Sequence, residues 1–254
     1  MIKVPAKYQK KGSLIVATDA SYAPMEFIDK DGKTVVGMDV DIGHAIGKIL
    51  GLKLKFENAS FDSIIPALQS GKYDVGMSSF SDTKKREEVV DFVTYFSAGT
   101  SFYVKAHSDL KVNGLDDLCG KSVAIEKGTT QVDDANAQSK KCTDAGKQAV
   151  TLLVFPDQNG ANLAIASGRA QAGLADSPVA AWIVKESRNQ FKLTGAAYNT
   201  VSYGVAVPKG SDLAAPLHEA INQLIKSGEY ANILRKWGIT QGGLKESKVN
   251  DAAE

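Results

Sequence analysis

Predicted strands and predicted helices alternate along the chain, and the alternation occurs twice. In the first half, a helix over 39–50 separates the strand LIVAT (14–18) from KLKFENA, and a helix through IIPALQ precedes the strand DVGMSS (74–79). Strands separated by helices favour a mostly parallel sheet with right-handed crossovers. KSVAIE, TLLVF and AGLAD repeat the pattern in the second half. We therefore expect two α/β lobes rather than one long sheet.

An internal similarity supports this division. LQSGKYDVGMSS (68–79) and IASGRAQAGLAD (165–176) share a helix end, a Ser-Gly-cation turn and a short strand that ends in polar residues. The match places Ser79 and Asp176 at equivalent strand ends, where open α/β sheets bind their ligands. A Ser-Gly-cation turn is common, so chance similarity remains the alternative.

The charge and composition of the chain limit the kinds of partner that it can bind. Thirty basic and 29 acidic residues leave a net charge of +1, so no bulk field draws the chain to nucleic acid or anionic lipid. No apolar run approaches the roughly 20 residues of a membrane helix. The three histidines are scattered and the two cysteines lack metal-ligand spacing, so we expect no metal and no other cofactor.

Cys119 and Cys142 leave two possibilities from the residues alone. They are either two buried thiols of an intracellular protein or, if the chain is exported, a disulfide. A bridge closing a loop of about 24 residues would add roughly 3 kcal/mol on the chain-entropy model.

The stretch SSFSDTKKREEVVDF (78–92) contains a predicted helix through KKREEVV with cations in its first turn. Ser81, Asp82 or Thr83 can cap that helix. Cations at a helix N-terminus are unfavourable unless an anion joins them. An anion site at this helix start is therefore one interpretation of the stretch.

Arg86 is the candidate receptor for that anion. Lys84 and Lys85 have glutamates one helical turn on, whereas Arg86 has valines there. Its planar fork matches the two oxygens of a carboxylate, and the hydroxyls of Ser79 and Ser81 are near in sequence. The alternative is a solvated helix start with Arg86 folded back on Asp82.

The second half contains another element that suits an anion. EKGTTQVDD (126–134) places Gly-Thr-Thr between a strand and a helix, where backbone amides and a threonine hydroxyl can hold a small carboxylate. It lacks the spacing of a nucleotide phosphate loop. An ordinary capped helix is the alternative.

Six motifs in order carry a resemblance to a known family. They are ATDASYAPMEF, VVGMDVDI, FDSIIPALQSGKYDV, SDTKKREEVVDF, EKGTTQ and SGRAQAGLADSPVA. The ending INQLIKSGEYANILRKWGI also resembles that family's closing helix pair. From about residue 12 to 239 the chain resembles the extracytoplasmic, periplasmic-type solute-binding proteins, family 3, of polar amino-acid ABC importers.

The resemblance implies a two-lobed periplasmic-binding-protein (Venus-flytrap) fold with two hinge crossings. Each lobe is then a mixed, mostly parallel sheet flanked by helices, and the lobes close on one free amino acid. The implied division is an N-terminal extension over 1–11, lobe 1 over 12–99 and 201–240, lobe 2 over 100–200, and a polar C-terminal tail over 241–254.

The resemblance also implies roles for individual residues. Arg86 takes the α-carboxylate, helped by Ser81 and Thr130, and Asp176 takes the α-ammonium, helped by Ser79. Tyr22 and Phe61 flank the ligand side chain, and Asp19 lies near its far end. The full expected set is Asp19, Tyr22, Phe61, Ser79, Ser81, Arg86, Glu126, Thr130, Gln131 and Asp176. The alternatives are core aromatics for Tyr22 and Phe61 and turn or cap acids for Asp19 and Asp176.

Specificity depends on Glu126. With Asp19, Glu126 offers two carboxylates to a cationic side chain such as that of arginine, lysine, ornithine or histidine. The alternative pairs Glu126 with Lys127 or Arg169, and a neutral amide such as glutamine then becomes competitive. Gln158 and Asn159 could supply hydrogen bonds to that amide.

A transport receptor is the leading interpretation of function. Its implied partners are a free L-amino acid and a membrane-embedded ABC permease, with no nucleic acid, and the chain is expected to be a monomer. The implied location is the periplasm or cell surface, with a lipid anchor through a removed N-terminal segment as one route, and there Cys119 and Cys142 form a disulfide. A receptor sensing domain and a dehydratase-like enzyme using Glu126 as general acid remain alternatives, although we expect no enzymatic activity.

Overall fold

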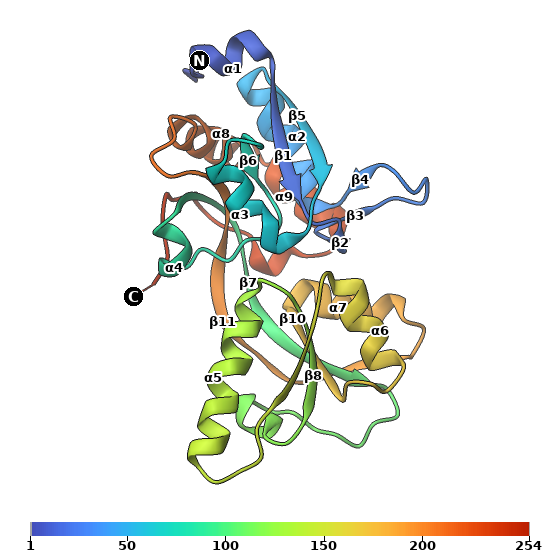
Figure 1. Ribbon diagram of the computed structural model, residues 1–254. Helices are drawn as coiled ribbons and strands as arrows, with labels where there is room; N and C mark the ends of the chain where they lie inside the picture. Colours follow the sequence, from blue (N-terminus) through green and yellow to red (C-terminus); the bar gives the residue numbers. More distant parts are fainter. Residues whose placement is uncertain (1, 254) are drawn as a thin grey trace. The chain divides into compact units, whose positions relative to one another are not determined.

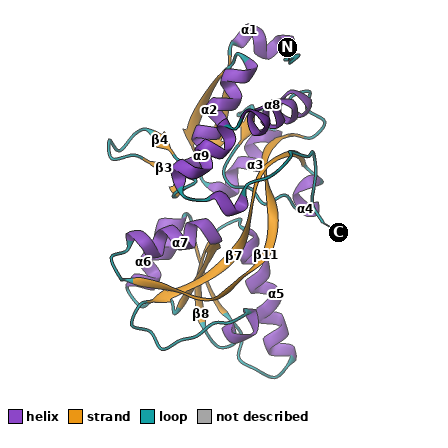
Figure 2. Ribbon diagram, turned by 180° about the vertical axis from the view of Figure 1, so that it is seen from behind, coloured by secondary structure: helices purple, strands orange, loops and turns teal. Residues whose placement is uncertain are grey.

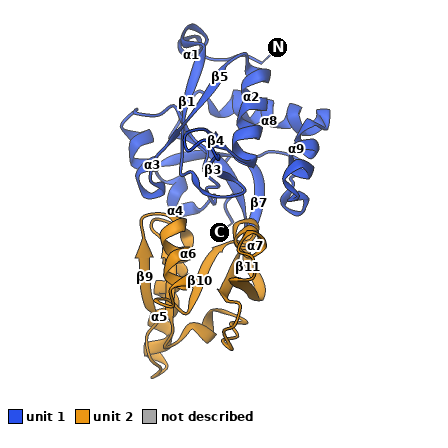
Figure 3. Cartoon of the chain, turned by 90° about the vertical axis from the view of Figure 1, so that its right-hand side faces the viewer, with its two compact units in different colours: residues 1–98, 201–254 blue, residues 99–200 orange. Residues whose placement is uncertain are grey.

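The computed structural model describes residues 2–253, which form two compact units (Figure 3). Unit 1 comprises Met1–Ala98 and Val201–Glu254, and unit 2 comprises Gly99–Thr200. The chain passes from unit 1 to unit 2 within β7 (Val90–Lys105) and returns within β11 (Phe191–Pro208). Both crossings therefore lie inside continuous strands rather than in loops.

Unit 1 is built on a parallel three-stranded arrangement. β1 (Ser13–Thr18) lies between β5 (Lys53–Asn58) and β6 (Val75–Gly76), and β11 adds to β6 in the antiparallel sense. α2 (Met38–Leu50) and α3 (Phe61–Gln69) connect these strands in opposite directions along the sheet. Right-handed crossovers therefore place the two helices on opposite faces (Figure 1).

Unit 2 repeats this topology. β8 (Ser122–Glu126) lies between β9 (Thr151–Phe155) and β10 (Ala172–Asp176), and all three strands are parallel. α5 (Thr130–Asp144) and α6 (Gln158–Ala166) are its crossover helices, and α7 (Ser177–Glu186) follows β10. β7 adds to β10 as an antiparallel strand. The predicted two-lobed α/β fold with mostly parallel sheets is confirmed.

The remaining elements lie mainly in unit 1. α8 (Ala214–Ser227) and α9 (Glu229–Trp237) pack against α2 and each other (Figure 2). The smaller elements are α1 (Ala6–Lys11), β2 (Ser21–Tyr22), β3 (Glu26–Ile28), β4 (Val35–Val36), α4 (Lys84–Glu87) and two 3₁₀ turns at Leu115–Leu118 and Thr240–Gly242. Within residues 2–253 no helix has the length and apolar character needed to cross a membrane.

Two expected elements are shorter than predicted. The helix expected through KKREEVV is only α4, because Val90 is fully buried and already starts β7. The strand expected over DVGMSS is reduced to the two residues of β6. In both places burial in the sheet and local turns, rather than helix or strand preference, determine where the element ends.

The internal similarity is visible in matching turns. α3 and α6 are each followed by a glycine with left-handed backbone, Gly71 (φ 77°) and Gly168 (φ 80°). The Gly71 N–H donates to the Leu68 carbonyl, and the Gly168 N–H donates to the Ile165 carbonyl. Because a side chain is strained at such φ values, glycine is favoured at both turns. The polar residues after β6 and at the end of β10 therefore follow equivalent turns.

The predicted disulfide is confirmed. Cys119 and Cys142 are joined, with their Cα atoms 5.6 Å apart and a sequence separation of 23 residues. Cys142 is buried in the apolar core of unit 2 with Leu118 and Val123, and Cys119 packs on the edge of that core. The bridge ties the 3₁₀ turn before β8 to the last turn of α5.

Two buried acids of unit 1 support the strand end that carries Ser79. Glu26 and Asp39 are both fully buried. Asp39 Oδ2 accepts hydrogen bonds from the Tyr95 hydroxyl (2.6 Å) and the Ser79 N–H (2.9 Å), and Glu26 Oε1 accepts one from the Ser78 hydroxyl (2.9 Å). Burial and the neighbouring Asp39 charge hold the pKa of Glu26 well above its usual range. Glu26 therefore stays protonated, and its O–H donates a hydrogen bond to Asp39.

We expect removal of the disulfide to destabilise unit 2. Replacing both cysteines, with Cys119→Ala and Cys142→Ala together, should lower the free energy of unfolding by about 3 kcal/mol, since the loop they close is then unconstrained in the unfolded chain. Chemical denaturation of oxidised wild type and of the double variant measures this, and a reductant should lower the denaturation midpoint of wild type only. Equal midpoints for oxidised wild type and the variant would contradict the expectation.

The buried acid pair should make stability depend on pH. Because its folded pKa is raised, protonated Glu26 contributes stability fully below its ordinary pKa of 4.5, and that contribution is lost as the pH rises through the folded value. Glu26→Gln keeps the shape and a donor, so its unfolding free energy should fall less steeply than that of wild type, by up to about 1.4 kcal/mol per pH unit. Urea midpoints from pH 4.5 upward measure it. The exposed control Glu57→Gln should follow wild type, and parallel curves for all three proteins would refute the effect.

Candidate functional site

Arg86 lies over a pair of stacked aromatic rings in unit 1. Phe61, the first residue of α3, stacks on Phe80 with ring centroids 4.5 Å apart. The Arg86 guanidinium carbon lies 5.4 Å from the Phe61 centroid and 5.5 Å from the Phe80 centroid. This cation–π contact, together with the weak hydration of guanidinium, favours keeping the group against the two rings.

Backbone contacts fix the chain around Arg86. Thr83 is the N-cap of α4, and its hydroxyl accepts a hydrogen bond from the Arg86 N–H at 3.3 Å. The Arg86 side chain donates to the carbonyl of Ser81 at 2.9 Å. Of the three capping candidates named from the sequence, Thr83 occupies the cap position. A guanidinium fork matches the two oxygens of a carboxylate.

Asp19 is held by the start of α3. Its Oδ2 accepts the Phe61 N–H at 2.9 Å, and its Oδ1 accepts the hydroxyl (2.6 Å) and N–H (3.1 Å) of Ser21. Asp19 is 5% exposed and follows β1 directly. The carboxylate therefore satisfies a free amide at a helix N-terminus, which is the cap role considered as the alternative to ligand contact.

Ser79 and Ser81 follow β6 in an unusual backbone. Ser79 has a φ of 50°, a left-handed value that a non-glycine residue adopts only when its surroundings impose it. Asp39 imposes it, because Asp39 Oδ2 accepts both the N–H of Ser79 and, at 3.2 Å, its hydroxyl. Ser81 is buried and pairs with Tyr203 in an isolated antiparallel bridge.

Tyr22, the expected aromatic neighbour of the ligand side chain, lies in β2 with 7% of its surface exposed.

In unit 2, Asp176 and Gln131 are bonded to each other. Gln131 Nε2 donates to Asp176 Oδ1 at 2.6 Å and to the Thr100 hydroxyl at 2.9 Å. Asp176 ends β10 and is 7% exposed, and Gln131 is 2% exposed in the first turn of α5. Gln131 is thus oriented toward Asp176, and its amide donates to the carboxylate proposed from sequence as the ammonium acceptor.

Glu126 and Thr130 lie at the adjoining strand end and helix start of unit 2. Glu126 ends β8 with 2% of its surface exposed, and Thr130 is the first residue of α5. The Thr129 hydroxyl donates to the Glu126 carbonyl at 2.8 Å, which fixes the turn between them. Burial raises the pKa of Tyr103, and the negative charge of Glu126 contributes to the same rise. The Glu126 carboxylate therefore acts on the interior of unit 2.

The two residues named for an amide ligand differ in their surroundings. Gln158 is buried, and its Nε2 donates to the Tyr103 hydroxyl and to Asn162 Oδ1, both at 2.9 Å. Its amide group is therefore built into unit 2. Asn159, the next residue of α6, is exposed.

The expected residues are divided between the two units. Unit 1 holds Asp19, Tyr22, Phe61, Ser79, Ser81 and Arg86, and unit 2 holds Glu126, Thr130, Gln131 and Asp176. Sequence reasoning missed Phe80, Glu26 and Asp39. A signal existed for the acids, which interrupt the apolar runs APMEF and VVGMDVDI. For Phe80 the sequence gives no signal other than its position between Ser79 and Ser81.

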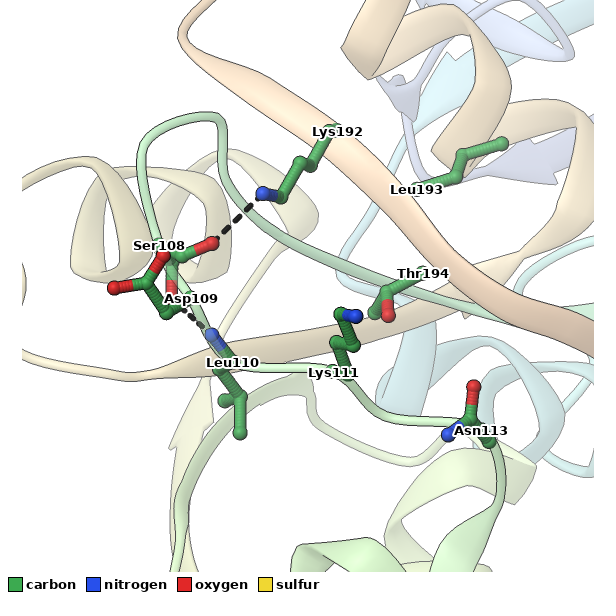
Figure 4. Close-up of a pocket in the computed structure, with 8 residues that line it drawn as sticks. All are labelled: Ser108, Asp109, Leu110, Lys111, Asn113, Lys192, Leu193 and Thr194. Atoms are coloured by element: carbon green, nitrogen blue, oxygen red, sulfur yellow. Dashed lines mark hydrogen bonds between the residues drawn. The ribbon is translucent and has the colours of Figure 1, made fainter.

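A surface pocket of unit 2 contains none of the expected residues. It measures about 350 Å³ and lies between the segment 108–113 and β11 residues 192–194 (Figure 4). Lys192 Nζ donates to the Ser108 carbonyl at 2.7 Å across it. Within the described residues, no group of three or more His, Cys, Asp and Glu side chains is arranged to hold a metal ion.

Comparison with known proteins identifies the family. The family model described as bacterial extracellular solute-binding proteins, family 3, matches residues 14–240. The arginine-binding protein ArgT of Corynebacterium glutamicum is 32% identical over 249 residues, covering 98% of this chain and 81% of the relative.

Solved structures agree with the sequence relatives. An ancestral arginine-binding protein bound to glutamine superposes with a TM-score of 0.82 at 37% identity, covering 90% of this chain and 98% of that chain. The ancestral amino acid-binding protein AncCDT-1, described as a precursor of cyclohexadienyl dehydratase, gives 0.81 at 34% identity, with 91% and 97% covered. The chain therefore belongs to the bacterial extracellular solute-binding proteins, family 3.

Proposed function

We propose that this protein binds a free amino acid with residues from both units and delivers it to the permease of an ABC importer. The observation that carries the proposal is the pair of opposite charges held ready in the two units. Arg86 lies over Phe61 and Phe80 in unit 1, and Asp176 accepts a hydrogen bond from Gln131 in unit 2. An α-carboxylate suits the first group and an α-ammonium suits the second.

The contacts within each unit support the remaining roles. Ser79 and Ser81 lie beside Arg86 in sequence and are held by Asp39 and Tyr203, so their polar groups are presented in fixed positions. Thr130 starts α5, where free amides favour an anion. Tyr22 and Phe61 supply aromatic surface for the ligand side chain. Because Ser79, Ser81 and Arg86 are held by contacts within unit 1, little conformational entropy is lost there when the ligand arrives.

A ligand that contacts both units would also stabilise one arrangement of the two. The ligand shifts such an equilibrium only by its difference in affinity between the arrangements. A zwitterion that needs Arg86 and Asp176 together supplies this difference, since one group alone satisfies half of its charge. The two crossings within β7 and β11 are where the chain would bend.

For the ligand we propose a cationic amino acid, with arginine first. The support is the acidic pair Asp19 and Glu126, both nearly buried, together with the relative named as an arginine-binding protein. A buried ligand cation is costly without a carboxylate partner, and this cost gives discrimination. The second candidate is glutamine, since a superposable ancestral arginine-binding protein is described as bound to glutamine.

We further propose that the chain acts as a monomer outside the cytoplasmic membrane and catalyses no reaction. The family description is extracellular, and the relative ArgT is named as a binding protein. Anchoring through a lipid on a removed N-terminal segment is one route to that location. One superposable structure is described as a precursor of a dehydratase, so a dehydratase-like activity is the enzymatic alternative, with Glu126 as the candidate general acid.

Calorimetric titration of ligand-stripped protein against the twenty amino acids, ornithine and citrulline tests the proposal. Arg86→Ala should weaken binding of the preferred ligand by about 2 to 5 kcal/mol, at least thirtyfold in Kd, because the ligand carboxylate then lacks its charged partner. Arg86→Lys should recover only part of the loss, since it lacks the planar fork. The exposed Arg235→Ala is the matched control. No binding by wild type, or equal binding by Arg86→Ala, would overturn the assignment.

Glu126→Gln separates the two ligand candidates. If Glu126 faces the ligand side chain, this variant should weaken arginine binding about tenfold and leave glutamine binding unchanged or stronger, because only the cation loses a charged partner. Competition titration of both ligands gives the ratio. Glu186→Gln, at the exposed end of α7, is the control. An unchanged arginine-to-glutamine ratio would assign Glu126 a structural role and make glutamine the better candidate.

A further inference from the structure

Residues 247–252, here called the C-terminal strap, lie beyond the family match at 14–240 and are docked on unit 1. Val249 forms an antiparallel bridge with Val93 at the start of β7. The Thr94 N–H donates to the Lys248 carbonyl, and the Lys248 N–H donates to the Thr94 hydroxyl, both at 2.8 Å. The strap therefore continues the sheet edge of the strand that follows Arg86.

Asn250 fixes the path of the strap. It has a left-handed backbone with a φ of 54°. Its N–H donates to the Phe92 carbonyl at 3.0 Å, its Oδ1 accepts the Phe92 N–H at 2.9 Å, and its Nδ2 donates to Asp91 Oδ1 at 2.9 Å. Asparagine tolerates this conformation better than most residues. One side chain thus joins the strap to two consecutive residues of β7.

The next two residues hold both sides of α4. The Asp251 N–H donates to Asp82 Oδ2 at 2.7 Å, and the Ala252 N–H donates to Glu87 Oε1 at 3.1 Å. Asp82 and Glu87 directly flank the segment from Thr83 to Arg86. The strap therefore contacts the carboxylates on either side of the residues that cap and orient Arg86.

Asp82 and Glu87 differ in their readiness to carry charge. Asp82 is 2% exposed, and no described residue donates a hydrogen bond to its Oδ1. Burial raises the pKa of Asp82 to about 7, the Asp251 N–H opposes the rise, and Glu87 adds to it. For Glu87, burial is outweighed by the Ala252 N–H, Asp82 and Lys84, which lower its pKa. Protonated Asp82 then donates to ionised Glu87.

We propose that the C-terminal strap is a positioning element for the ligand's carboxylate receptor: by holding Asp82 and Glu87 it keeps Arg86 oriented toward the ligand. The inference rests on the proposed function of Arg86 and extends it to a segment that the family match does not include. No strap residue is placed in contact with the ligand. The strap acts through the α4 segment, whose ends would otherwise lose two hydrogen bonds.

We expect the docking of the C-terminal strap on unit 1 to depend on pH. Burial in the docked arrangement raises the pKa of Asp82 to about 7 and outweighs the Asp251 N–H, which lowers it, so we expect docking to weaken as the pH rises through about 7. An ionised Asp82 would lie beside the charges of Glu87 and Asp251. The other charged groups at the strap are Lys84 on Glu87, Lys248 on Asp251, Lys209 on the Glu87 carbonyl, and Asp91, which accepts from Asn250 and pairs with Lys209. His218 contacts the Ser247 carbonyl.

Asn250→Gly in the full chain tests the positioning role. Glycine accepts the left-handed backbone, so the variant removes only the side-chain bonds to Phe92 and Asp91. Asn189→Gly is the matched control, because Asn189 is exposed in unit 2 with a φ of 67°. Hydrogen exchange at the Asp251, Ala252 and Arg86 amides should be faster in Asn250→Gly only. Its affinity for arginine, or for glutamine if the panel prefers it, should fall about fivefold.

Asp82→Asn tests the pH dependence and distinguishes it from a merely structural role. Asparagine reproduces the protonated acid, accepting from Asp251 through its oxygen and donating to Glu87 through its nitrogen. Wild-type affinity should fall about threefold from pH 6 to pH 8, while Asp82→Asn keeps the wild-type pH 6 affinity throughout. Since His218 is unchanged in this variant, a pH profile equal to that of wild type would overturn the assignment to Asp82.

The outcomes separate this inference from the proposed function. If wild type binds an amino acid and Asn250→Gly binds it equally well, the positioning role is refuted and the proposed function stands. Fast exchange at the Asp251 and Ala252 amides of wild type would also refute it, because the strap would not be docked. If wild type binds nothing in the panel, the proposed function fails. Unchanged exchange at the Arg86 amide in Asn250→Gly then refutes the strap independently.

Discussion

The hydrogen bonds accepted by one buried carboxylate, Asp39, join three segments of unit 1. Asp39 lies in the first turn of α2, its Oδ2 accepts from Tyr95 of β7 and from Ser79 after β6, and protonated Glu26 of β3 donates to it. A buried charge is tolerated only when hydrogen bonds of this kind satisfy it. The left-handed backbone of Ser79 follows from that requirement, and with it the direction of the chain toward Arg86.

The same principle governs unit 2 with different groups. There the end of β10 is held by Gln131, whose amide joins Asp176 to Thr100 of β7. Each unit therefore orients its own polar residues at the carboxyl ends of parallel strands, using partners from its crossover helix and from a long strand. The matching topology explains why one sequence similarity, around Gly71 and Gly168, marks equivalent positions in both units.

The sequence predicted the fold in more detail than the site. Strand and helix periodicity sufficed for the order of elements and for parallel sheets, because both depend on local burial patterns. Periodicity failed at α4, because Val90 belongs to β7, where it is buried by distant segments that local preference does not reveal. The motif-based residues are divided between the two units, and the supporting partners in unit 1, Phe80, Glu26 and Asp39, are fixed by contacts between distant segments. The contacts made by the strap have the same origin and no local signal.

Hydrogen bonding also bears on which carboxylate could recognise a ligand cation. Asp19 accepts three hydrogen bonds from Ser21 and Phe61, so most of the roughly four acceptor positions of its carboxylate serve unit 1 itself. One of those donors is the first amide of α3, which gains from a negative charge whether or not a ligand is present. These bonds account for much of the role of Asp19 within unit 1, whereas the charge of Glu126 acts inside unit 2, where it also raises the pKa of Tyr103. We therefore propose that discrimination between a cation and a neutral amide depends chiefly on Glu126.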